Sequence, residues 1–461
     1  MEDITLNEVL EAVKGQLINE GILNKFNVIS TDTRKIEEGS IFIALKGENF
    51  NGNEFILEAI KKGAALCIID ELKFPKESLD INASIIKVEN TKTALLMLAE
   101  YYRSTLPIKI IGLTGSTGKT TTKDITSALL MGKYKVFKTQ GNFNNEIGLP
   151  LMIFNLDKSY EVAVLEMGMS NLNEIHNMSK AAKPDIALIT NIGVSHLENL
   201  KTRQNILKAK MEITHFFQVE NTLILNVDND LLSEASNEER NYNLIKTGTT
   251  LAADYVAKNI ILTENSVTFD VYYKEKLEYS GFKLNIPGKH NVLNAILAIA
   301  AAKLLGVTYE QMQEGLKTLT MTSMRLDIIK GRRFTLIDDC YNASPDSMKA
   351  AIDVLNDVKG KRKLAIVGTM RELGDNAYEL HKEIGEYLKN KRIDCLITTG
   401  EFENAYKDGY DKSECFYCFE SIDKINEFLK GFLMEEDVVM VKASRSMKFE
   451  KIVNEIKTLN F

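Results

Sequence analysis

The stretch GLTGSTGKTTTK, residues 112–123, decides the fold of this 461-residue chain. An apolar run, residues 108–111, precedes it, and a segment of helical character follows it. A strand, a glycine-rich bend and a helix in this order are what a phosphate-binding loop requires, because several backbone N–H groups then face one anion at the positive end of the helix. Lys119 is placed to reach the outer phosphates, and the hydroxyl of Thr120 to bind Mg²⁺.

The loop departs from the usual phosphate-loop pattern at one position. That pattern has a glycine six residues before the lysine, where this chain has Leu113. A tighter Thr-Gly-x-x-Gly-Lys-Thr bend remains, in which Gly115 and Gly118 let the backbone turn. The alternative is an ordinary turn of small residues with an unrelated lysine. The order of strand, glycines, lysine, hydroxyl and helix favours the phosphate loop.

Strand-like runs alternate with helix-like segments on both sides of this loop. In the central region the expected strands are residues 108–113, 162–166, 186–190 and 223–227. The same alternation continues at 334–338, 363–367, 395–398 and 438–441, and shorter runs precede the loop at 40–45, 65–69 and 84–88, with a helical stretch at 53–63. Alternation predicts mostly parallel sheets that bind ligands beyond the carboxyl ends of their strands. We therefore expect an α/β protein with three domains, at residues 1–88, 89–323 and 324–461.

Composition excludes several classes of protein. A formal charge of −7 gives no reason to expect binding to nucleic acid or to an anionic membrane. The sequence has no apolar run of membrane-spanning length, and its acidic start is unlike a signal peptide. Five cysteines in a chain of this size do not form a disulfide framework, so we expect a reduced, cytoplasmic protein. Cys415 and Cys418 form a lone CxxC, for which two thiols on a strand or loop are favoured over a zinc site.

Polar side chains stand at the ends of two further expected strands. Glu166 ends the run VAVLE, and a carboxylate at this edge of a parallel sheet is suited to hold a metal ion. His196 and Glu198 follow the next strand in ALITNIGVSHLENL, so they belong to the same edge. A solvated glutamate and a structural histidine are the alternatives for each residue taken singly. Further on, Lys208 and Lys210 lie on different faces of an expected helix, and spacing alone marks both as ordinary solvated lysines.

Taken together, these motifs resemble the Mur ligases, ATP-dependent enzymes that form amide bonds in peptidoglycan precursors. The resemblance runs from about residue 30 to about residue 450 and rests on TGSTGKTT, GNFNNEIGLP, LEMG, NIGVSHLE, KAKMEI, GKHNVLNAILA, MRLD, DDCYNASPDSM and VKASRSMK. YNASPDSM and GTMRELGD resemble the branch of the family that joins D-alanyl-D-alanine to UDP-N-acetylmuramoyl-tripeptide. The resemblance implies a substrate-binding N-terminal domain, a central ATPase, and a C-terminal Rossmann-like domain that closes over it. It also implies ATP and Mg²⁺, and we expect a monomer.

The resemblance assigns roles residue by residue. It implies catalytic roles for Lys119, Glu166, His196 and Lys210, with Lys210 matching a lysine that relatives convert to a carbamate. Metal binding falls to Thr120, Glu166 and His196. The residues expected to bind ATP are Gly115, Ser116, Thr117, Gly118, Lys119, Thr120, Thr121, Asn291, Asn294, Arg325 and Asp339. Those expected to bind the muramoyl peptide are Thr31, Asp32, Thr33, Arg34, Lys46, Gly47, Asn144 and Asn145.

Two positions differ from the family pattern. The chain has NGN at 51–53 where relatives have Asp-Gly-His, and Ala443 where they have a glycine. The first concerns recognition of uridine, and the second the approach of the last domain to substrate.

The chemistry expected of such a chain is activation of a carboxylate by phosphoryl transfer, followed by attack of an amine. In phosphoryl transfer the main role of the protein is to neutralise the negative charge on the transferring phosphoryl group. A nearby carboxylate and His196 are the alternatives for the base that keeps the amine unprotonated. The rival functions are another ligase of this superfamily, such as folylpolyglutamate synthase, and a regulatory protein that hydrolyses ATP without ligation. The STDTR and ALKGENFNG segments of the first domain argue against a folate enzyme.

Overall fold

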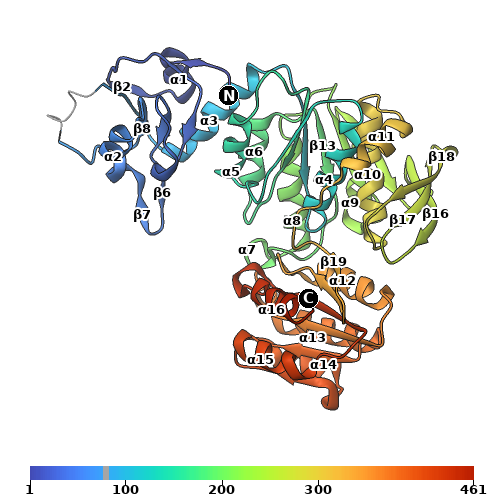
Figure 1. Cartoon of the computed structure of the whole chain (residues 1–461). Helices are drawn as coiled ribbons and strands as arrows, with labels where there is room; N and C mark the ends of the chain where they lie inside the picture. Colours follow the sequence, from blue (N-terminus) through green and yellow to red (C-terminus); the bar gives the residue numbers. More distant parts are fainter. Residues whose placement is uncertain (76–81, 461) are drawn as a thin grey trace.

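The structure, a computed structural model, describes residues 1–75 and 82–460. Within these residues three large sheets follow one another along the chain, with five, nine and six strands. Figure 1 shows the corresponding units in blue, in cyan to yellow, and in orange to red. The α/β class and the three-part organisation predicted from the sequence are confirmed.

The N-terminal unit is built on a sheet of order β2-β9-β8-β5-β4. Strands β4 (Ile29–Ser30), β5 (Ile41–Ile43), β8 (Leu66–Ile69) and β9 (Ser84–Lys87) run parallel, and β2 (Gln16–Asn19) is an antiparallel edge. A short hairpin, β6 (Lys46–Gly47) and β7 (Phe50–Asn51), lies beside it. The helical stretch expected at 53–63 is a 3-10 turn (Gly52–Phe55) followed by α2 (Ile56–Lys61). The sequence analysis did not predict α1 (Leu6–Val13), although Thr5 and Glu8 form a capping box at its start.

The central sheet has the order β11-β12-β10-β13-β14-β15-β16-β17-β18. Its parallel part comprises β10 (Lys109–Thr114), β11 (Val136–Lys138), β12 (Val162–Glu166), β13 (Ile186–Ile189), β14 (Thr222–Asn226), β15 (Asn243–Gly248) and the start of β16 (Tyr255–Leu262). Strands β17 (Val267–Tyr273) and β18 (Lys276–Leu284) extend it in antiparallel fashion from β16. The sequence analysis did not identify this extension. Its strands expose one face, so their apolar residues alternate and form no continuous run.

Both faces of the parallel part are covered by helices. Val162 and Val164 of β12 belong to a core that includes α4 (Lys119–Met131) and α10 (His290–Leu304). Ala163 and Leu165 belong to the opposite core, which includes α3 (Thr91–Ser104), α5 (Gly148–Phe154) and α6 (Glu174–Ala182). Because side chains alternate along a strand, a strand covered on both sides must be apolar throughout. This is why the central strands appear as continuous hydrophobic runs.

The C-terminal sheet has the order β19-β20-β24-β21-β22-β23. Strand β19 (Asp327–Lys330) is antiparallel to β20 (Thr335–Asp338); the parallel strands that follow are β24 (Asp437–Lys442), β21 (Arg362–Val367), β22 (Cys395–Thr398) and β23 (Phe416–Cys418). Its helices are α12 (Pro345–Asp357), α13 (Ala377–Asn390), α14 (Glu403–Tyr410), α15 (Ile422–Phe432) and α16 (Glu450–Asn460). Cys418 ends the edge strand β23 and Cys415 directly precedes that strand, both as free thiols.

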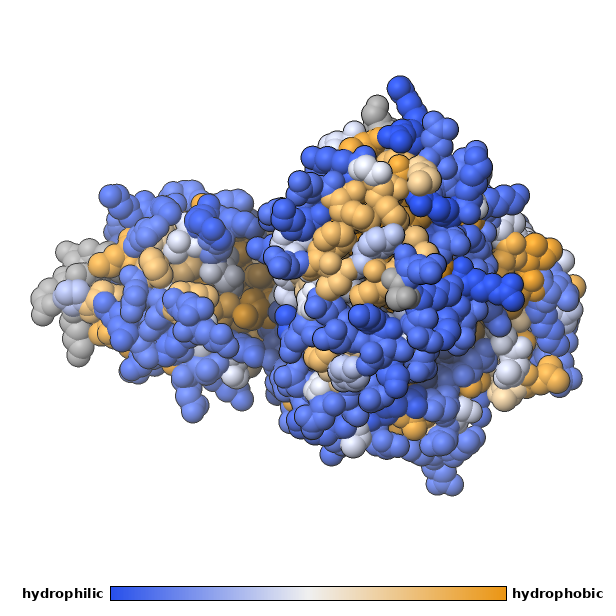
Figure 2. All heavy atoms as spheres, turned by 90° about the horizontal axis from the view of Figure 1, so that it is seen from below, coloured by the Kyte–Doolittle hydropathy of each residue, from blue (hydrophilic) through white to orange (hydrophobic). Residues whose placement is uncertain are grey.

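The three units are arranged around the central sheet. The C-terminal unit lies below it in Figure 1, and the N-terminal unit lies to one side. Seen from below, the N-terminal unit projects as a separate lobe from a larger and mostly hydrophilic body (Figure 2). In the described parts of the chain, no helix combines the length and the apolar character needed to cross a bilayer. The carboxyl edge of β10, β12 and β13 faces the C-terminal unit, so the candidate site lies between these two units.

Candidate active site

The bend between β10 and α4 needs glycine at two positions. Gly115 has φ +153°, and a Cβ there would lie 1.8 Å from Oγ1 of Thr190. Gly118 has φ +77°, and a Cβ there would lie 2.7 Å from Oδ1 of Asn294. A side chain at either residue would meet both an unfavourable backbone conformation and a neighbouring polar group. The tight loop therefore forms as the sequence predicted.

Asn191, which follows β13, holds the loop in place. Its backbone oxygen accepts from the N–H of Ser116 (3.0 Å). Its side chain accepts from the N–H of Thr117 (2.9 Å) and donates to the hydroxyl of the same residue (2.8 Å). The hydroxyl of Ser116 accepts in turn from the N–H of Gly193 (2.9 Å). These bonds fix the conformation of the glycine-rich loop. The sequence analysis did not select Asn191.

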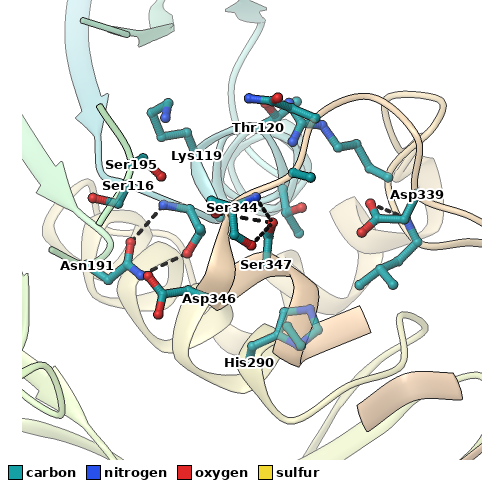
Figure 3. A pocket seen from close by; sticks show the side chains of 18 of the residues that line it. Ser116, Lys119, Thr120, Asn191, Ser195, His290, Asp339, Ser344, Asp346 and Ser347 are labelled. Atoms are coloured by element: carbon teal, nitrogen blue, oxygen red, sulfur yellow. Dashed lines mark hydrogen bonds between the residues drawn. The ribbon is translucent and has the colours of Figure 1, made fainter. Parts of the chain in front are cut away.

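The loop forms one wall of a cavity of about 310 Å³ between the central and C-terminal units. Figure 3 shows Lys119 and Thr120 at the start of α4 on one side, and Ser344, Asp346 and Ser347 at the start of α12 on the other. The predicted ATP-binding residues that line it are Ser116, Thr117, Gly118, Lys119, Thr120, Thr121, Asn291, Asn294, Arg325 and Asp339. The structure thus brings together residues from positions 116 to 339 of the chain.

Lys119 points back across its own loop. Its Nζ donates to the backbone oxygen of Gly115 at 2.8 Å. The surrounding protein lowers the pKa of this ammonium group, an effect that the nearby carboxylate of Glu166 opposes. A desolvated lysine with a negative neighbour is suited to hold a triphosphate, whose charge would restore its usual preference for the protonated form.

Glu166 ends β12 and is 2% exposed. Its Oε1 accepts from the amide of Asn144 at 2.8 Å, whereas its Oε2 is buried without a hydrogen-bond partner. A buried carboxylate oxygen with no partner is costly unless a ligand satisfies it. Glu166 is therefore built to receive a donor or a cation.

Spacing did not distinguish Lys208 from Lys210, the family resemblance named Lys210, and the structure shows that Lys210 is the buried one of the two. Lys208 is exposed on α8 (Arg203–Met211), whereas Lys210 is 1% exposed. Burial lowers the pKa of Lys210 well below its ordinary value, and the positive charge of Lys119 lowers it further. Two positively charged lysines close together in the interior repel each other, so the uncharged amine form of Lys210 is favoured.

His196 lies in the loop after β13 and contacts a residue that the sequence analysis did not select. Its Nδ1 pairs with the carboxylate of Glu372, from the loop that follows β21. Hydrogen bonding to His196 lowers the pKa of Glu372. The backbone oxygen of Glu372 also accepts from the N–H of Glu198 at 3.1 Å. These contacts join the C-terminal unit to the central unit at the edge of the cavity.

The remaining nucleotide candidates line the same cavity, and two of them, Asn294 and Arg325, lie directly beside the loop. Asn291 and Asn294 lie on the first turns of α10 and are bonded to each other at 3.0 Å. Asp339 forms an ion pair with the buried Lys442. The guanidinium of Arg325 lies 4.1 Å from the ring centre of Tyr341, and its Nη2 is 3.4 Å from Oγ1 of Thr120.

The muramoyl candidates are placed apart from this cavity. Thr31, Asp32, Thr33 and Arg34 lie at the 3-10 turn Thr33–Lys35, and Lys46 and Gly47 in the β6–β7 hairpin, all in the N-terminal unit. The exposed Arg34 pairs with Asp32 at 2.8 Å and lowers the pKa of that carboxyl to about 2. Lys46 pairs with Glu71 at 2.6 Å.

The two asparagines of the central unit are engaged within the protein. Asn144 holds Glu166, as described above. Asn145 accepts from the N–H groups of Gly148 (2.7 Å) and Ile147 (3.2 Å) at the start of α5. Asn53, in the NGN segment, is buried and bonds Asp70 through its amide nitrogen at 2.7 Å. This departure from the family pattern therefore leaves a satisfied side chain in the N-terminal unit.

Several cavity residues were not selected from the sequence. They are Asn191, Ser195, His290, Ser344, Asp346, Ser347, Arg371, Glu372 and Lys442. Each stands inside a quoted motif, such as GKHN for His290 and VKASRSMK for Lys442, so position within those motifs was the available signal. In the residues that the structure describes, no three His, Cys, Asp or Glu side chains are grouped to hold a metal ion by themselves.

Comparisons with known proteins agree along nearly the whole chain. Three family models match: Mur ligase family, catalytic domain (residues 25–103), Mur ligase middle domain (113–302), and Mur ligase, glutamate ligase domain (324–445). The UDP-N-acetylmuramoyl-tripeptide--D-alanyl-D-alanine ligase of Bacillus subtilis (strain 168) is 39% identical over 461 residues, covering 98% of each chain.

Solved structures match as well. A crystal structure of MurF from Acinetobacter baumannii superimposes with a TM-score of 0.91 at 30% identity, covering 99% of each chain. MurF ligase from Thermotoga maritima in complex with ADP gives a TM-score of 0.83 at 31% identity, covering 94% of this chain and 97% of that one.

Proposed function

This chain belongs to the Mur ligase family, and from that premise we propose how its residues carry out ligation. The protein is an ATP-dependent ligase that joins D-alanyl-D-alanine to UDP-N-acetylmuramoyl-tripeptide. The observation that carries the proposed roles is the phosphate loop at residues 115–121, which opens into a cavity closed by the C-terminal unit. The products are the pentapeptide, ADP and phosphate.

A free carboxylate is inert towards an amine, because oxide would be the leaving group. Transfer of the γ-phosphoryl group of ATP to the tripeptide carboxylate gives an acyl phosphate, and the amine of D-alanyl-D-alanine then displaces phosphate to form the amide. Lys119 offsets the charge that develops on the transferring group, and the N–H groups of the loop hold the phosphates. Asn291, Asn294, Arg325 and Asp339 bind the rest of the nucleotide.

The residues at this edge fit a bound Mg²⁺. Glu166 offers a buried oxygen without a partner, and Thr120 a hydroxyl at the start of α4. Mg²⁺ is commonly held by one or two protein oxygens together with phosphate oxygens and waters, so a complete protein cage is not required. When bound, the ion neutralises phosphate charge. We propose that Thr120 and Glu166 hold it, with His196 contributing to a second site.

His196 serves either that second site or the proton transfer from the amine. In both roles Nε2 is the working atom, because Nδ1 faces Glu372. A carboxylate against Nδ1 keeps the hydrogen there and leaves the lone pair on Nε2.

Lys210 is proposed to act as a carbamate. The reaction needs an unprotonated amine that attacks carbon dioxide and releases one proton, and burial beside Lys119 favours the unprotonated form. The resulting negative charge would offset that of Lys119.

Recognition of the muramoyl peptide is assigned to the N-terminal unit. We propose that Thr31, Asp32, Thr33, Arg34, Lys46 and Gly47 hold its UDP end and that Asn144 and Asn145 shape the peptide end. The domain limits 1–88, 89–323 and 324–461 are part of this proposal; they are supported by the end of β9 at Lys87 and by the segment between residues 318 and 327. We also propose that the protein is a monomer and that it is cytoplasmic; the five free thiols agree with a reducing compartment.

Release of phosphate from ATP tests the proposal directly. We expect release only when both UDP-N-acetylmuramoyl-tripeptide and D-alanyl-D-alanine are present, with the lysine and diaminopimelate tripeptides compared in parallel. Release without either substrate would favour a nucleotide-gated regulator. Lys119→Ala should lower ligation at least about 1000-fold with an unchanged circular-dichroism spectrum, because charge neutralisation is the main service to phosphoryl transfer. Ligation at the normal rate would reject the phosphate-loop assignment.

A further inference from the structure

The segment that joins the central and C-terminal units is fastened to the helix of the phosphate loop. It spans residues 319–326, between a 3-10 turn (Leu316–Thr318) and β19. Within it, Thr322 donates twice to Oδ2 of Asp124, from its backbone N–H (3.0 Å) and its hydroxyl (2.8 Å). Asp124 lies on α4, five residues after Lys119 and therefore little more than one turn from the loop.

Asp124 is 1% exposed and depends on its partners. Lys138 of β11 contacts its Oδ1 at 2.7 Å, and the buried Lys123 lies 3.4 Å from the same oxygen. Lys123 is itself held by the backbone oxygen of Thr139 at 3.0 Å. A buried carboxylate is costly unless it is both charge-paired and hydrogen-bonded. One oxygen is used for the lysines and the other for Thr322, so the carboxylate ties the segment to α4.

Three residues after Thr322, Arg325 stands between two residues that have an unusual backbone conformation. Its neighbours Met324 and Leu326 have φ +61° and +51°, a left-handed region that bulky side chains disfavour. Such conformations persist only where surrounding contacts determine them.

Those contacts come from the C-terminal unit. The backbone oxygen of Met324 accepts from Tyr341 at 3.3 Å, and the N–H of Leu326 donates to Asp339 at 3.1 Å. The Nε of Arg325 is buried without a hydrogen-bond partner. Arg325 also lines the cavity, so its guanidinium combines a place at the site with a donor that has no partner.

We propose that Asp124 is a positioning residue for ligation. By holding Thr322, it fixes the central-unit end of the connecting segment while Met324 and Leu326 fix the other end. Arg325 is then held between these anchors, against Thr120 at the phosphate loop. Asp124 touches no reactant and acts through Arg325. Because Arg325 contacts both the C-terminal unit and the phosphate loop, the position of the C-terminal unit then affects nucleotide binding. This inference rests on the proposed phosphate-binding role of residues 115–121.

The test removes one hydrogen bond and leaves the shape of the side chain. Thr322→Val keeps the branched side chain and loses the hydroxyl that donates to Asp124. The matched control is Thr318→Val, whose hydroxyl donates to the backbone oxygen of Gly315 at 2.8 Å instead. Calorimetry measures the Kd of a non-hydrolysable ATP analogue with Mg²⁺. We expect Thr322→Val to raise this Kd about tenfold, since a hydrogen bond to a charged group is lost. Thr318→Val should leave it unchanged, and Thr322→Ser should restore it to within about twofold.

A double-mutant cycle separates positioning from a general structural role. If Asp124 acts through Arg325, Thr322→Val in an Arg325→Ala background should change the Kd by less than about twofold. Asp124→Asn is the second variant, and its effect should also shrink in that background. The proposal would be overturned if Thr322→Val raised the Kd equally in the unaltered protein and in Arg325→Ala. It would also be overturned if Thr322→Val left the Kd of the otherwise unaltered protein unchanged. Nucleotide binding without ligation by the unaltered protein would count against the proposed function and leave this test valid. Failure to bind the analogue at all would refute the phosphate loop on which both rest.

Discussion

Mild acid should lower the free energy of unfolding of the C-terminal unit, because His381 of α13 is buried as a neutral imidazole. Both of its ring nitrogens are already hydrogen-bonded, so the folded protein disfavours the protonated ring. Its Nε2 accepts from the N–H of Met370 at 2.8 Å, and its Nδ1 lies 2.6 Å from the backbone oxygen of Ala377. The hydrogen must therefore sit on Nδ1, and a proton on Nε2 would point at another donor. The ring also stacks on Phe402 with centroids 4.4 Å apart. Burial lowers the pKa of His381 to about 4.

The sign of the effect follows from the two states. Above the unfolded pKa of about 6.5 both states are neutral, and the full stability is present. Below it the unfolded chain binds a proton that the folded chain does not, so the free energy of unfolding falls until the pH reaches about 4. At about 1.4 kcal/mol per pH unit, the free energy of unfolding falls by about 3 kcal/mol between the unfolded and the folded pKa of His381. His381 accepts a hydrogen bond from Met370, which directly precedes the cavity residues Arg371 and Glu372. Protonation of His381 should therefore displace these residues, and ligation activity should decline over the same pH range.

Hydrogen exchange with mass spectrometry gives the opening free energy of peptides from β21 and α13. Between pH 6.5 and 4.5, these peptides should lose about 2–3 kcal/mol in the unaltered protein. In His381→Gln most of this dependence should disappear, since glutamine accepts from Met370 without titrating. His176→Gln, on α6 of the central unit, controls for the loss of a histidine. The same pH dependence in His381→Gln and the unaltered protein would refute the reasoning.

Three further outcomes follow from the site. Glu166→Gln should lower kcat by roughly 100-fold or more, with partial recovery at high Mg²⁺; normal activity would remove Glu166 from the metal site. Lys210→Ala should be inactive and regain activity with added short-chain carboxylates, and full activity without them would contradict a carbamate. Gly115→Ala would place a Cβ 1.8 Å from the hydroxyl of Thr190, so thermal melts should show a loss of about 2–4 kcal/mol. A stable Gly115→Ala protein with an unchanged Kd for nucleotide would contradict the account of the loop.

The strands that surround the phosphate loop were predictable because burial on both faces leaves an uninterrupted apolar run. β10, β12, β13 and β14 all begin and end within one residue of the expected limits. The antiparallel strands β17 and β18 were missed, since only alternate residues are apolar there. Of Lys208 and Lys210, spacing selected neither, and burial in the folded chain distinguishes them.

The sequence by itself determined the strand, glycine-rich bend and helix at residues 109–131, because the bend depends on contacts among neighbouring residues. Through the family motifs, the sequence also indicated which segments of the chain supply the candidate site. Only the tertiary structure decided that His196 faces Glu372 and that Asp124 holds Thr322. Those pairs are 176 and 198 residues apart in the chain. The physical reason is that hydrogen bonds and ion pairs depend on distances of about 3 Å, and chain folding alone sets such distances between remote residues.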